Sequence, residues 1–286
     1  MINIIILKKW KKLICVKKKI LISGSAGFVG LNVLKFINKK KYNIFAVRNK
    51  TFKKRDKKIY YIKADLTNYD KFKKVFKNIK PDIFIHLAGL KDPRKVEKMK
   101  NYAYKINYKT NLWISNQLDP NTHIIFLSTD KVYNKACKVA KETSLCKPST
   151  LYGKLKLKTE KIFIKKFKRL HILRVPIIHS YGDKNSSFID NLILQSKIKR
   201  KFVAKNIIRS FIKIDDLSKF IIKLINFQNY GVYNIGSKGE SYFSRTKKYA
   251  IKSKNNIISC DKDKIYPVHQ ELKTDKLKKT FKVKFL

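Results

Sequence analysis

A short glycine-containing stretch near the N-terminus constrains the fold more than any other part of the chain. An apolar run, Lys19–Ile22, precedes Gly24, Gly27 and Gly30, and an amphipathic segment continues to Ile37. This order predicts a strand, a tight turn and a helix. Gly24 would let the chain reverse, Gly27 would let the backbone approach a phosphate, and Gly30 would let the helix pack closely on the strand. Because the N-terminal end of a helix attracts anions, the stretch predicts a dinucleotide-binding turn.

The net charge of the chain is large, but its distribution does not indicate a nucleic-acid-binding protein. The 286 residues include 69 Lys and Arg against 19 Asp and Glu, which gives a formal charge of +50. The lysines are spread over nearly every surface-type segment, and no recognisable nucleic-acid-binding module accompanies them. The hydrophobic content of 44% is ordinary for a folded domain. We therefore expect a globular protein without a nucleic-acid partner.

Residues 1–17 form a basic N-terminal extension. Lysines interrupt its apolar run before a secretory core is long enough, and no small-residue cleavage site follows. We expect a cytoplasmic protein without stable membrane insertion, while a weak amphipathic surface anchor and a mispredicted start both stay open for this segment. The four cysteines are scattered without paired spacing, so we expect neither a disulfide framework nor a metal site.

Apolar segments and helix-forming segments alternate along the first half of the chain. A helix is expected from near Tyr69 and another over Tyr102–Gln117. The expected strands are Tyr42–Arg48, Ile59–Ile62, Pro81–Gly89, His123–Leu127 and Leu173–Pro176. Such alternation is typical of the α/β class with a doubly wound parallel sheet, the Rossmann arrangement, which has helices on both faces. Ligands of these sheets bind beyond the carboxyl ends of the strands.

Residues at several strand ends indicate how a dinucleotide would be held. Arg48 stands where many NAD-binding folds carry an acid for the ribose hydroxyls, so its charge favours the extra phosphate of NADP, although a solvated basic loop is the other interpretation. Asp65 follows the third strand, where it can accept a hydrogen bond from an adenine amine or cap the helix near Tyr69. Ala88 and Gly89 end the fourth strand with small side chains, past which a cofactor could run closely.

One tyrosine and one lysine are spaced for acid/base chemistry. Tyr152 and Lys156 are four residues apart in a helix-forming segment, so both side chains lie on one helix face. A nearby ammonium favours the phenolate and would bring proton exchange closer to neutral pH. Thr129 lies just upstream, at the end of the fifth strand. His86 alone is more typical of a packed strand residue than of a catalyst.

Together these residues resemble the extended short-chain dehydrogenase/reductase family. Within it the chain is similar to the nucleotide-sugar epimerases, dehydratases and reductases, and above all to the dTDP-4-dehydrorhamnose reductase group. The resemblance runs from about Lys18 to near the C-terminus and depends on the joint order of motifs that are weak alone. These motifs are Gly24, Gly27 and Gly30, Asp65-Leu66, His86-Leu87-Ala88-Gly89, Asn107, Ser128-Thr129-Asp130, Val132-Tyr133, Tyr152, Lys156 and Glu160.

The resemblance implies hydride transfer between a nicotinamide cofactor and a sugar carbon. Tyr152 would be the catalytic acid/base, Lys156 would lower the pKa of that tyrosine and hold the nicotinamide ribose, and Thr129 would hydrogen-bond the reacting sugar oxygen. The implied cofactor is NADP in preference to NAD. The residues expected to bind it are Gly24, Gly27, Phe28, Val29, Gly30, Arg48, Asp65, Leu66, Leu87, Ala88, Gly89, Asn107 and Lys156.

The resemblance also implies a nucleotide-sugar substrate. Its expected contacts are Thr129, Asp130, Tyr152, Phe188 and Arg209, the last as the cation for the diphosphate. Tyr266 stands where relatives carry an arginine, so one diphosphate contact is missing or comes from another cation.

The residue after Asp130 bears on the type of reaction. Dehydratases of the dTDP-glucose type carry an Asp-Glu pair here, whereas this chain has Lys131, which argues against that chemistry and leaves dehydration as a minor alternative. A 4-keto reductase is favoured, and a 4-epimerase shares the same residues. A non-catalytic cofactor-binding regulatory subunit is the alternative from a different class.

The resemblance predicts two lobes. Residues 18–175 are expected to form the NAD(P)-binding Rossmann domain and 176–286 mainly a smaller substrate-binding lobe, with part of 205–235 returning to the first. A homodimer is an expectation from the family alone.

Overall fold

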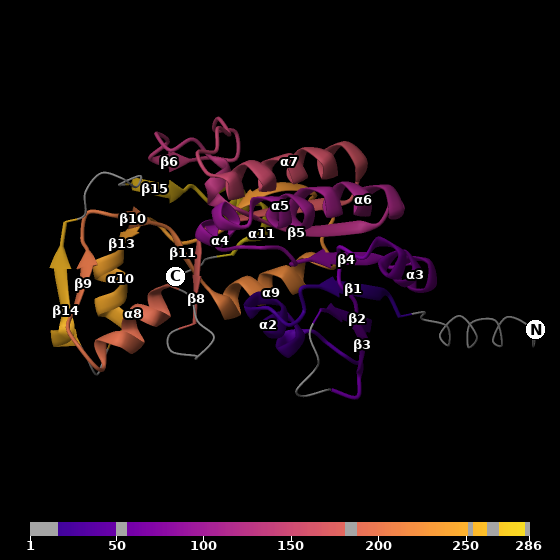
Figure 1. Cartoon of the computed structure of the whole chain (residues 1–286), viewed down its shortest axis with the longest axis horizontal. Coiled ribbons are helices and arrows are strands. Elements are labelled where there is room, and N and C mark those ends of the chain that lie inside the picture. The colour runs from indigo at the N-terminus through magenta and orange to yellow at the C-terminus, as the bar shows by residue number, and fades with distance from the viewer. Residues whose placement is uncertain (1–16, 50–55, 181–187, 251–253, 262–268, 284–286) are drawn as a thin grey trace, which may run out of the picture.

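The computed structural model describes residues 17–49, 56–180, 188–250, 254–261 and 269–283 (Figure 1). The predictions made for residues 1–16 and for Tyr266 lie outside these ranges, as does the side chain of Phe188. None of the helices in these ranges combines the length and the apolar character needed to cross a bilayer.

Seven parallel strands form the central sheet. In chain order they are β1 (Lys19–Ser23), β2 (Asn43–Arg48), β3 (Ile59–Lys63), β4 (Ile83–His86), β5 (His123–Thr129), β7 (Leu170–Val175) and β12 (Gly231–Asn234). In space the order is β12-β7-β5-β4-β1-β2-β3, and every neighbouring pair is parallel. The doubly wound sheet predicted from the sequence is therefore confirmed. Its strand order reverses between β1 and β4, which is where such sheets bind ligands.

Helices cover both faces of this sheet, as Figure 1 shows. Those on one face are α2 (Phe28–Phe36), α9 (Ile214–Leu224) and α11 (Asp275–Phe281), and those on the other are α3 (Tyr69–Ile79), α6 (Thr110–Gln117) and α7 (Leu151–Lys166). Alternate residues of β1 supply the two cores: Ile20 and Ile22 pack toward α2 and α9, while Leu21 packs toward the opposite helices.

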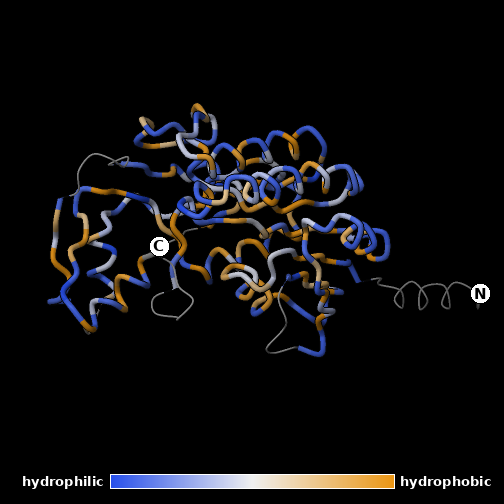
Figure 2. The backbone as a smooth tube through the Cα atoms, viewed as in Figure 1, coloured by the Kyte–Doolittle hydropathy of each residue, from blue (hydrophilic) through white to orange (hydrophobic). Residues whose placement is uncertain are grey.

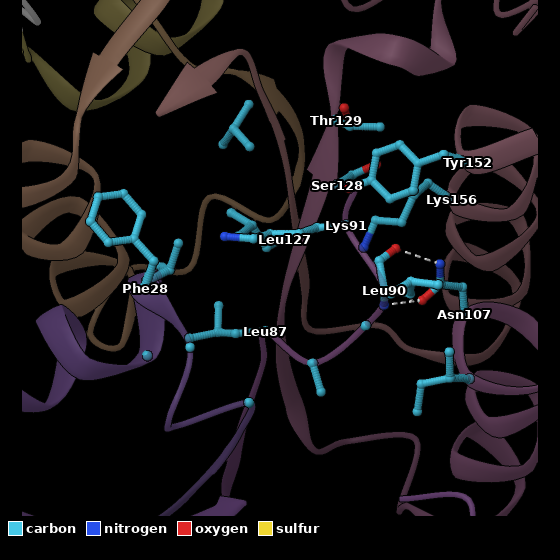
Figure 3. Close-up of a pocket in the computed structure, with 18 of the residues that line it drawn as sticks. Phe28, Leu87, Leu90, Lys91, Asn107, Leu127, Ser128, Thr129, Tyr152 and Lys156 are labelled. Carbon is cyan, nitrogen blue, oxygen red and sulfur yellow. Dashed lines mark hydrogen bonds between the residues drawn. The ribbon is translucent and has the colours of Figure 1, made fainter. Parts of the chain in front are cut away.

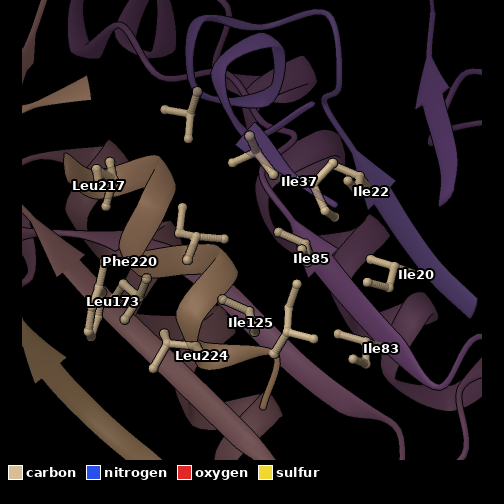
Figure 4. Packing of buried hydrophobic residues seen from close by; sticks show 14 of the residues in the cluster. Ile20, Ile22, Ile37, Ile83, Ile85, Ile125, Leu173, Leu217, Phe220 and Leu224 are labelled. Carbon is tan, nitrogen blue, oxygen red and sulfur yellow. The ribbon is translucent and has the colours of Figure 1, made fainter. Parts of the chain in front are cut away.

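Burial on both faces explains why the central strands read as nearly continuous apolar runs. Figure 4 shows Leu217, Phe220 and Leu224 of α9 lying over isoleucines of β1 and β4 and over Leu173 of β7. Figure 2 shows the complementary pattern in the helices, whose hydrophilic and hydrophobic residues alternate along the tube. The hydrophobic stripe of each such helix provides most of its stability through packing.

The second lobe is built around smaller sheets. Its strands and helices, with the one strand that reaches it from the first half, are β6 (Val139–Ala140), β8 (Ile177–His179), α8 (Phe188–Ser196), β9 (Lys201–Ala204), β10 (Ile208–Arg209), β11 (Phe211–Lys213), β13 (Glu240–Ser241), α10 (Tyr242–Tyr249), β14 (Ile257–Cys260) and β15 (His269–Leu272). Strands β13-β10-β15-β6 form a mixed four-stranded sheet. Ile189 of α8, Val203 of β9 and Ile257 of β14 share one small core.

Parts of the second half return to the central sheet. Helix α9 packs against it and β12 extends its edge. Leu277 and Phe281 of α11 join the same core, which the sequence did not indicate. The domain boundary near residue 176 remains a prediction.

Candidate active site

A cavity of about 560 Å³ opens at the carboxyl edge of the central sheet. That volume is typical of small-molecule and cofactor sites. Every residue predicted to bind the cofactor lines it, together with the three predicted catalytic residues and Asp130. Figure 3 shows Thr129, Tyr152 and Lys156 gathered on one wall, with Phe28 and Leu87 across the cavity from them.

The glycine turn has the geometry that the sequence predicted. Gly24 has φ +67°, and a Cβ there would lie 2.7 Å from the Ala88 nitrogen, so the close approach of β1 to the end of β4 requires glycine. Gly27 is the N-cap of α2, and as a glycine it makes no side-chain cap hydrogen bond with that helix end. Since no acidic residue lies in its first turn, the N-terminal N–H groups of α2 can bind an anion.

The carboxylate of Asp65 is held by its neighbours. It accepts hydrogen bonds from the Thr67 backbone N–H and hydroxyl, each at 2.8 Å, and from the Asn49 amide at 3.0 Å. The N-cap of α3 is Asn68, whose side chain accepts from the Lys71 N–H, so the capping alternative for Asp65 is wrong. A contact from Asp65 to adenine stays a prediction.

Asn107 lies in a π-helical segment, Lys105–Lys109, between α5 (Lys100–Tyr104) and α6. The sequence pattern predicted a continuous helix here. The wider turn leaves the Asn107 carbonyl free to accept from Thr159 Oγ1 at 2.8 Å and from the Asn111 amide at 2.9 Å. The Asn107 side chain bonds both backbone groups of Leu90 at 2.8 Å, as Figure 3 shows. Asn107 therefore fixes the loop after β4 against the helix that carries Lys156.

The start of α7 is packed against the end of β5. Thr150 caps this helix by accepting from the Gly153 N–H. A Cβ at Gly153 would collide with the Lys131 carbonyl, so only glycine lets α7 begin this close to the turn after Thr129. This packing brings Tyr152 next to Thr129.

The pKa of Tyr152 lies above its ordinary value. Burial raises it most and the charge of Asp130 raises it further, while a hydrogen bond with Thr129 opposes both. The tyrosine-to-lysine spacing had predicted a lowered pKa. The direction of the shift is the opposite of that prediction, because burial of the ring disfavours the phenolate. Tyr152 therefore keeps its proton and is prepared to act as an acid.

Lys156 is buried, with 8% of its surface exposed, and its Nζ lies 4.0 Å from the centroid of the Phe126 ring. Burial lowers the pKa of Lys156 to about 7, although the charge of Glu160 raises it. An anionic group beside Lys156 would restore the ammonium by the same electrostatic rule.

Lys156→Met is expected to alter how the stability of the ligand-free protein depends on pH. The pKa of Lys156 is about 7 in the folded state against an ordinary 10.5. Below pH 7 both states are protonated and the buried ammonium destabilises the fold. Between the two values only the unfolded state keeps the proton, so the unfolding free energy of the wild type rises with pH. Urea unfolding across that range should show the stability advantage of Lys156→Met shrinking, and a constant difference would contradict the assignment.

A buried ion pair supports the catalytic wall. Arg174 Nη2 lies 2.7 Å from Glu160 Oε2, and Glu160 also accepts from the Ser128 hydroxyl. Arg174 further donates to the Tyr133 hydroxyl at 2.9 Å, and the pKa of Arg174 is raised, with Glu160 the main cause opposing burial. Ser128 lines the cavity beside Thr129. In the sequence, only the resemblance pointed to Glu160. Arg174 could have been identified because it is a charged residue inside the otherwise apolar run of β7.

His86 is a packing residue, as the sequence indicated. It is buried and does not line the cavity. Its Nδ1 lies 2.6 Å from the Ser23 hydroxyl and its Nε2 lies 2.6 Å from Asn111 Oδ1. Burial lowers the pKa of His86 to about 3, so the ring is neutral and orders these neighbours.

Of the five predicted substrate residues, Arg209 does not line the cavity and Phe188 has no described side chain. Arg209 is 2% exposed in β10, and one of its Nη atoms donates to the Ile208 carbonyl. Sequence reasoning missed Lys91 and Tyr102, which do line the cavity. Lys91 Nζ lies 5.8 Å from the centroid of the Phe28 ring. The sequence of the loop that carries Lys91 has no distinguishing pattern.

A family model described as the RmlD substrate binding domain matches residues 18–282. The curated relatives include the spore coat polysaccharide biosynthesis protein SpsK of Bacillus subtilis, 25% identical over 77% of this chain and 74% of the relative. Methionine adenosyltransferase 2 subunit beta of Danio rerio is 23% identical over 58% of this chain and 50% of its own length. The dTDP-4-dehydrorhamnose reductase of Aggregatibacter actinomycetemcomitans is 24% identical over 63% of this chain and 57% of its own length. The chain thus spans half the length of the second of these relatives and little more than half that of the third.

Solved structures share the fold. The dTDP-4-dehydrorhamnose reductase of Bacillus anthracis in complex with NADP superposes with a TM-score of 0.81 at 21% identity, covering 94% of this chain and 95% of the other. WbmG of Bordetella bronchiseptica in complex with NAD superposes with a TM-score of 0.81 at 18% identity, covering 94% of this chain and 89% of the other. UDP-glucose 4-epimerase of Thermotoga maritima with UDP-glucose superposes with a TM-score of 0.76 at 19% identity, covering 91% of each chain.

Proposed function

Because the chain belongs to the RmlD substrate binding domain family, we propose that it is an NAD(P)-dependent oxidoreductase that reduces a keto group of a nucleotide sugar. The observation that carries this proposal is the joint placement of Thr129, Tyr152 and Lys156 on one wall of a cavity whose opposite end is the glycine turn. The relatives named dTDP-4-dehydrorhamnose reductase share this fold and favour the same reaction class.

The cavity fits a dinucleotide. The N-terminal end of α2 can offer its N–H groups to a pyrophosphate, and Leu87 and Ala88 line the same cavity. Four cations line the cavity against two acids, so its charge suits an anionic ligand. We propose that residues 18–175 hold the cofactor and that most of 176–286 holds the sugar nucleotide.

The chemistry of the wall suits reduction. Bound in this cavity, a reduced nicotinamide cofactor would supply the hydride. Tyr152, whose raised pKa keeps it protonated, would donate its phenolic proton to the keto oxygen as negative charge develops there. Thr129 would donate a hydrogen bond to the same oxygen. Lys156 would hold the cofactor ribose, and its ammonium would place a positive charge beside the phenol.

Arg48→Ala tests the preference for NADP. Arg48 lines the cavity at the end of β2, where the ribose phosphate of NADP would lie. A charge-assisted hydrogen bond is worth about 1.5–3 kcal/mol, so NADPH affinity should fall at least about tenfold while NADH affinity changes little. Fluorescence titration with both cofactors measures this. Lys74→Ala, an exposed lysine of α3, is the control, and equal losses for both cofactors in Arg48→Ala would argue against the assignment.

A 4-epimerase is the second candidate, since a UDP-glucose 4-epimerase shares the fold. An epimerase returns the hydride to the same sugar, so it consumes no cofactor. A subunit of another enzyme is a third, because one relative is named methionine adenosyltransferase 2 subunit beta.

Cofactor consumption separates these candidates. The purified protein would be mixed with NADPH or NADH and with a panel of 4-keto nucleotide sugars, and loss of reduced cofactor would be followed by absorbance. A reductase oxidises one equivalent of cofactor for each sugar. Cofactor binding without net oxidation favours an epimerase or a subunit. Incubating the NAD⁺-loaded protein with a 4-hydroxy nucleotide sugar such as UDP-glucose then distinguishes the two, because only an epimerase forms the 4-epimer. Absence of cofactor binding would overturn the proposal.

A further inference from the structure

The turn after β5 places a lysine at the reacting end of the cavity. The Lys131 backbone N–H donates to the Thr129 hydroxyl at 3.3 Å, and the Lys131 carbonyl is the group that packs against Gly153 at the start of α7. The backbone of Lys131 therefore contacts both Thr129 and the residue after Tyr152, and Thr129 and Tyr152 are the two side chains that would contact the reacting oxygen. Its side chain lines the same cavity and is 31% exposed.

The ammonium of Lys131 is held loosely by the residues the structure describes. Its contacts are Gln270 Oε1 at 3.4 Å and Asp130 Oδ2 at 3.9 Å. A charge-assisted hydrogen bond to a carboxylate is normally about 2.7–2.9 Å long, so neither contact is a strong one. Asp130 Oδ1 is also engaged, since it accepts from the Thr129 hydroxyl at 3.2 Å. Gln270 fixes the direction of the ammonium without neutralising it.

A second cation lies near Lys131. Arg209 is buried in β10 and is paired in register with Gln270 of β15, the residue that Lys131 contacts. Burial lowers the pKa of Lys131 most, the charge of Asp130 raises it, and the charge of Arg209 lowers it further. Because an opposite charge favours the charged form of a buried lysine, an incoming anion would stabilise the ammonium of Lys131.

We propose that Lys131, directed by Gln270 and reinforced by the charge of Arg209, binds an anionic oxygen group of the substrate next to the reacting carbon. The inference rests on the proposed function, since it assumes a sugar nucleotide in this cavity. Two parts of such a substrate carry anionic oxygens: a carboxylate on the sugar ring and the diphosphate. The position of Lys131 beside Thr129, which would contact the reacting sugar oxygen, favours a sugar carboxylate, and hence an acidic sugar as substrate class.

The test compares two nucleotide sugars that differ only at C6 of the sugar, which is a carboxylate in one and a hydroxymethyl group in the other. UDP-glucuronate and UDP-glucose share the nucleotide and the diphosphate, so their binding to the NADP-loaded protein isolates the effect of the carboxylate. Isothermal titration would be carried out with the wild type, Lys131→Gln, the charge-retaining Lys131→Arg, and Lys154→Gln. The last removes an exposed lysine of α7 that does not line the cavity and is the matched control.

For a sugar carboxylate, Lys131→Gln should weaken UDP-glucuronate at least about tenfold and UDP-glucose little, with Lys131→Arg restoring most of the loss. Equal weakening of both ligands, and of UDP itself, would assign Lys131 to the diphosphate instead. Unchanged binding of both ligands in Lys131→Gln would overturn the inference while leaving the proposed function intact. If the NADP-loaded wild type binds neither ligand nor their dTDP counterparts, the proposed function fails, and the inference fails with it.

Discussion

Tyr152→Phe is expected to lower kcat for the reduction by about 10²–10⁴, the range that a positioned general acid contributes. The variant loses only the hydroxyl that would protonate the keto oxygen, and the ring that packs between Thr129 and Lys156 remains. Cofactor affinity should therefore be unchanged. Single-turnover oxidation of NADPH, started by adding the keto sugar, measures the chemical step directly.

Tyr102→Phe is the matched control for this change. Tyr102 lines the same cavity, but the charge that acts on it is that of Asp65, whereas Tyr152 is near Asp130 and Thr129. Its variant should turn over at nearly the wild-type rate. A Tyr152→Phe protein that reduces the substrate as fast as Tyr102→Phe would show that another group donates the proton.

Arg174→Met is expected to destabilise the protein by about 3–5 kcal/mol, because it leaves the buried carboxylate of Glu160 without its partner. Glu160 is 1% exposed and its oxygens accept from Arg174 and from Ser128. Methionine fills much of the arginine volume, so the lost charge accounts for most of the effect. Urea unfolding monitored by circular dichroism measures it.

The double variant Glu160→Gln with Arg174→Met separates charge from packing. Removing both charges should recover most of the stability that Arg174→Met loses, since a buried ion pair contributes little net stability once its desolvation is counted. If the double variant is as unstable as the sum of the single variants, the two residues act independently and the ion pair does not organise this wall.

The fold followed from local patterns in the sequence. The apolar run at 19–22 and the three glycines after it predicted a strand, a turn and a helix, and the run at 123–127 predicted another strand. The four-residue spacing of Tyr152 and Lys156 placed both side chains on one face of the predicted helix. Such signals depend on neighbours in the chain, so they are visible without a structure.

The electrostatics of the site did not follow in the same way. The pKa of Tyr152 is raised where the spacing to Lys156 predicted a decrease, because burial depends on elements far apart in sequence. The contact between Lys131 and Gln270 joins residues 139 positions apart, and no local pattern marks it. The π-helical turn at Asn107 also depends on Thr159, which lies on another helix.

The central claim is that the cavity transfers a hydride to a sugar carbon with Tyr152 as the proton donor. Transfer of deuterium from deuterium-labelled NADPH to a 4-keto nucleotide sugar, followed by mass spectrometry of the sugar, tests it most directly. The account predicts one deuterium on each reduced sugar, with the label appearing at least about a hundredfold more slowly in Tyr152→Phe. An unlabelled product, or labelling that is as fast without the Tyr152 hydroxyl, would contradict it.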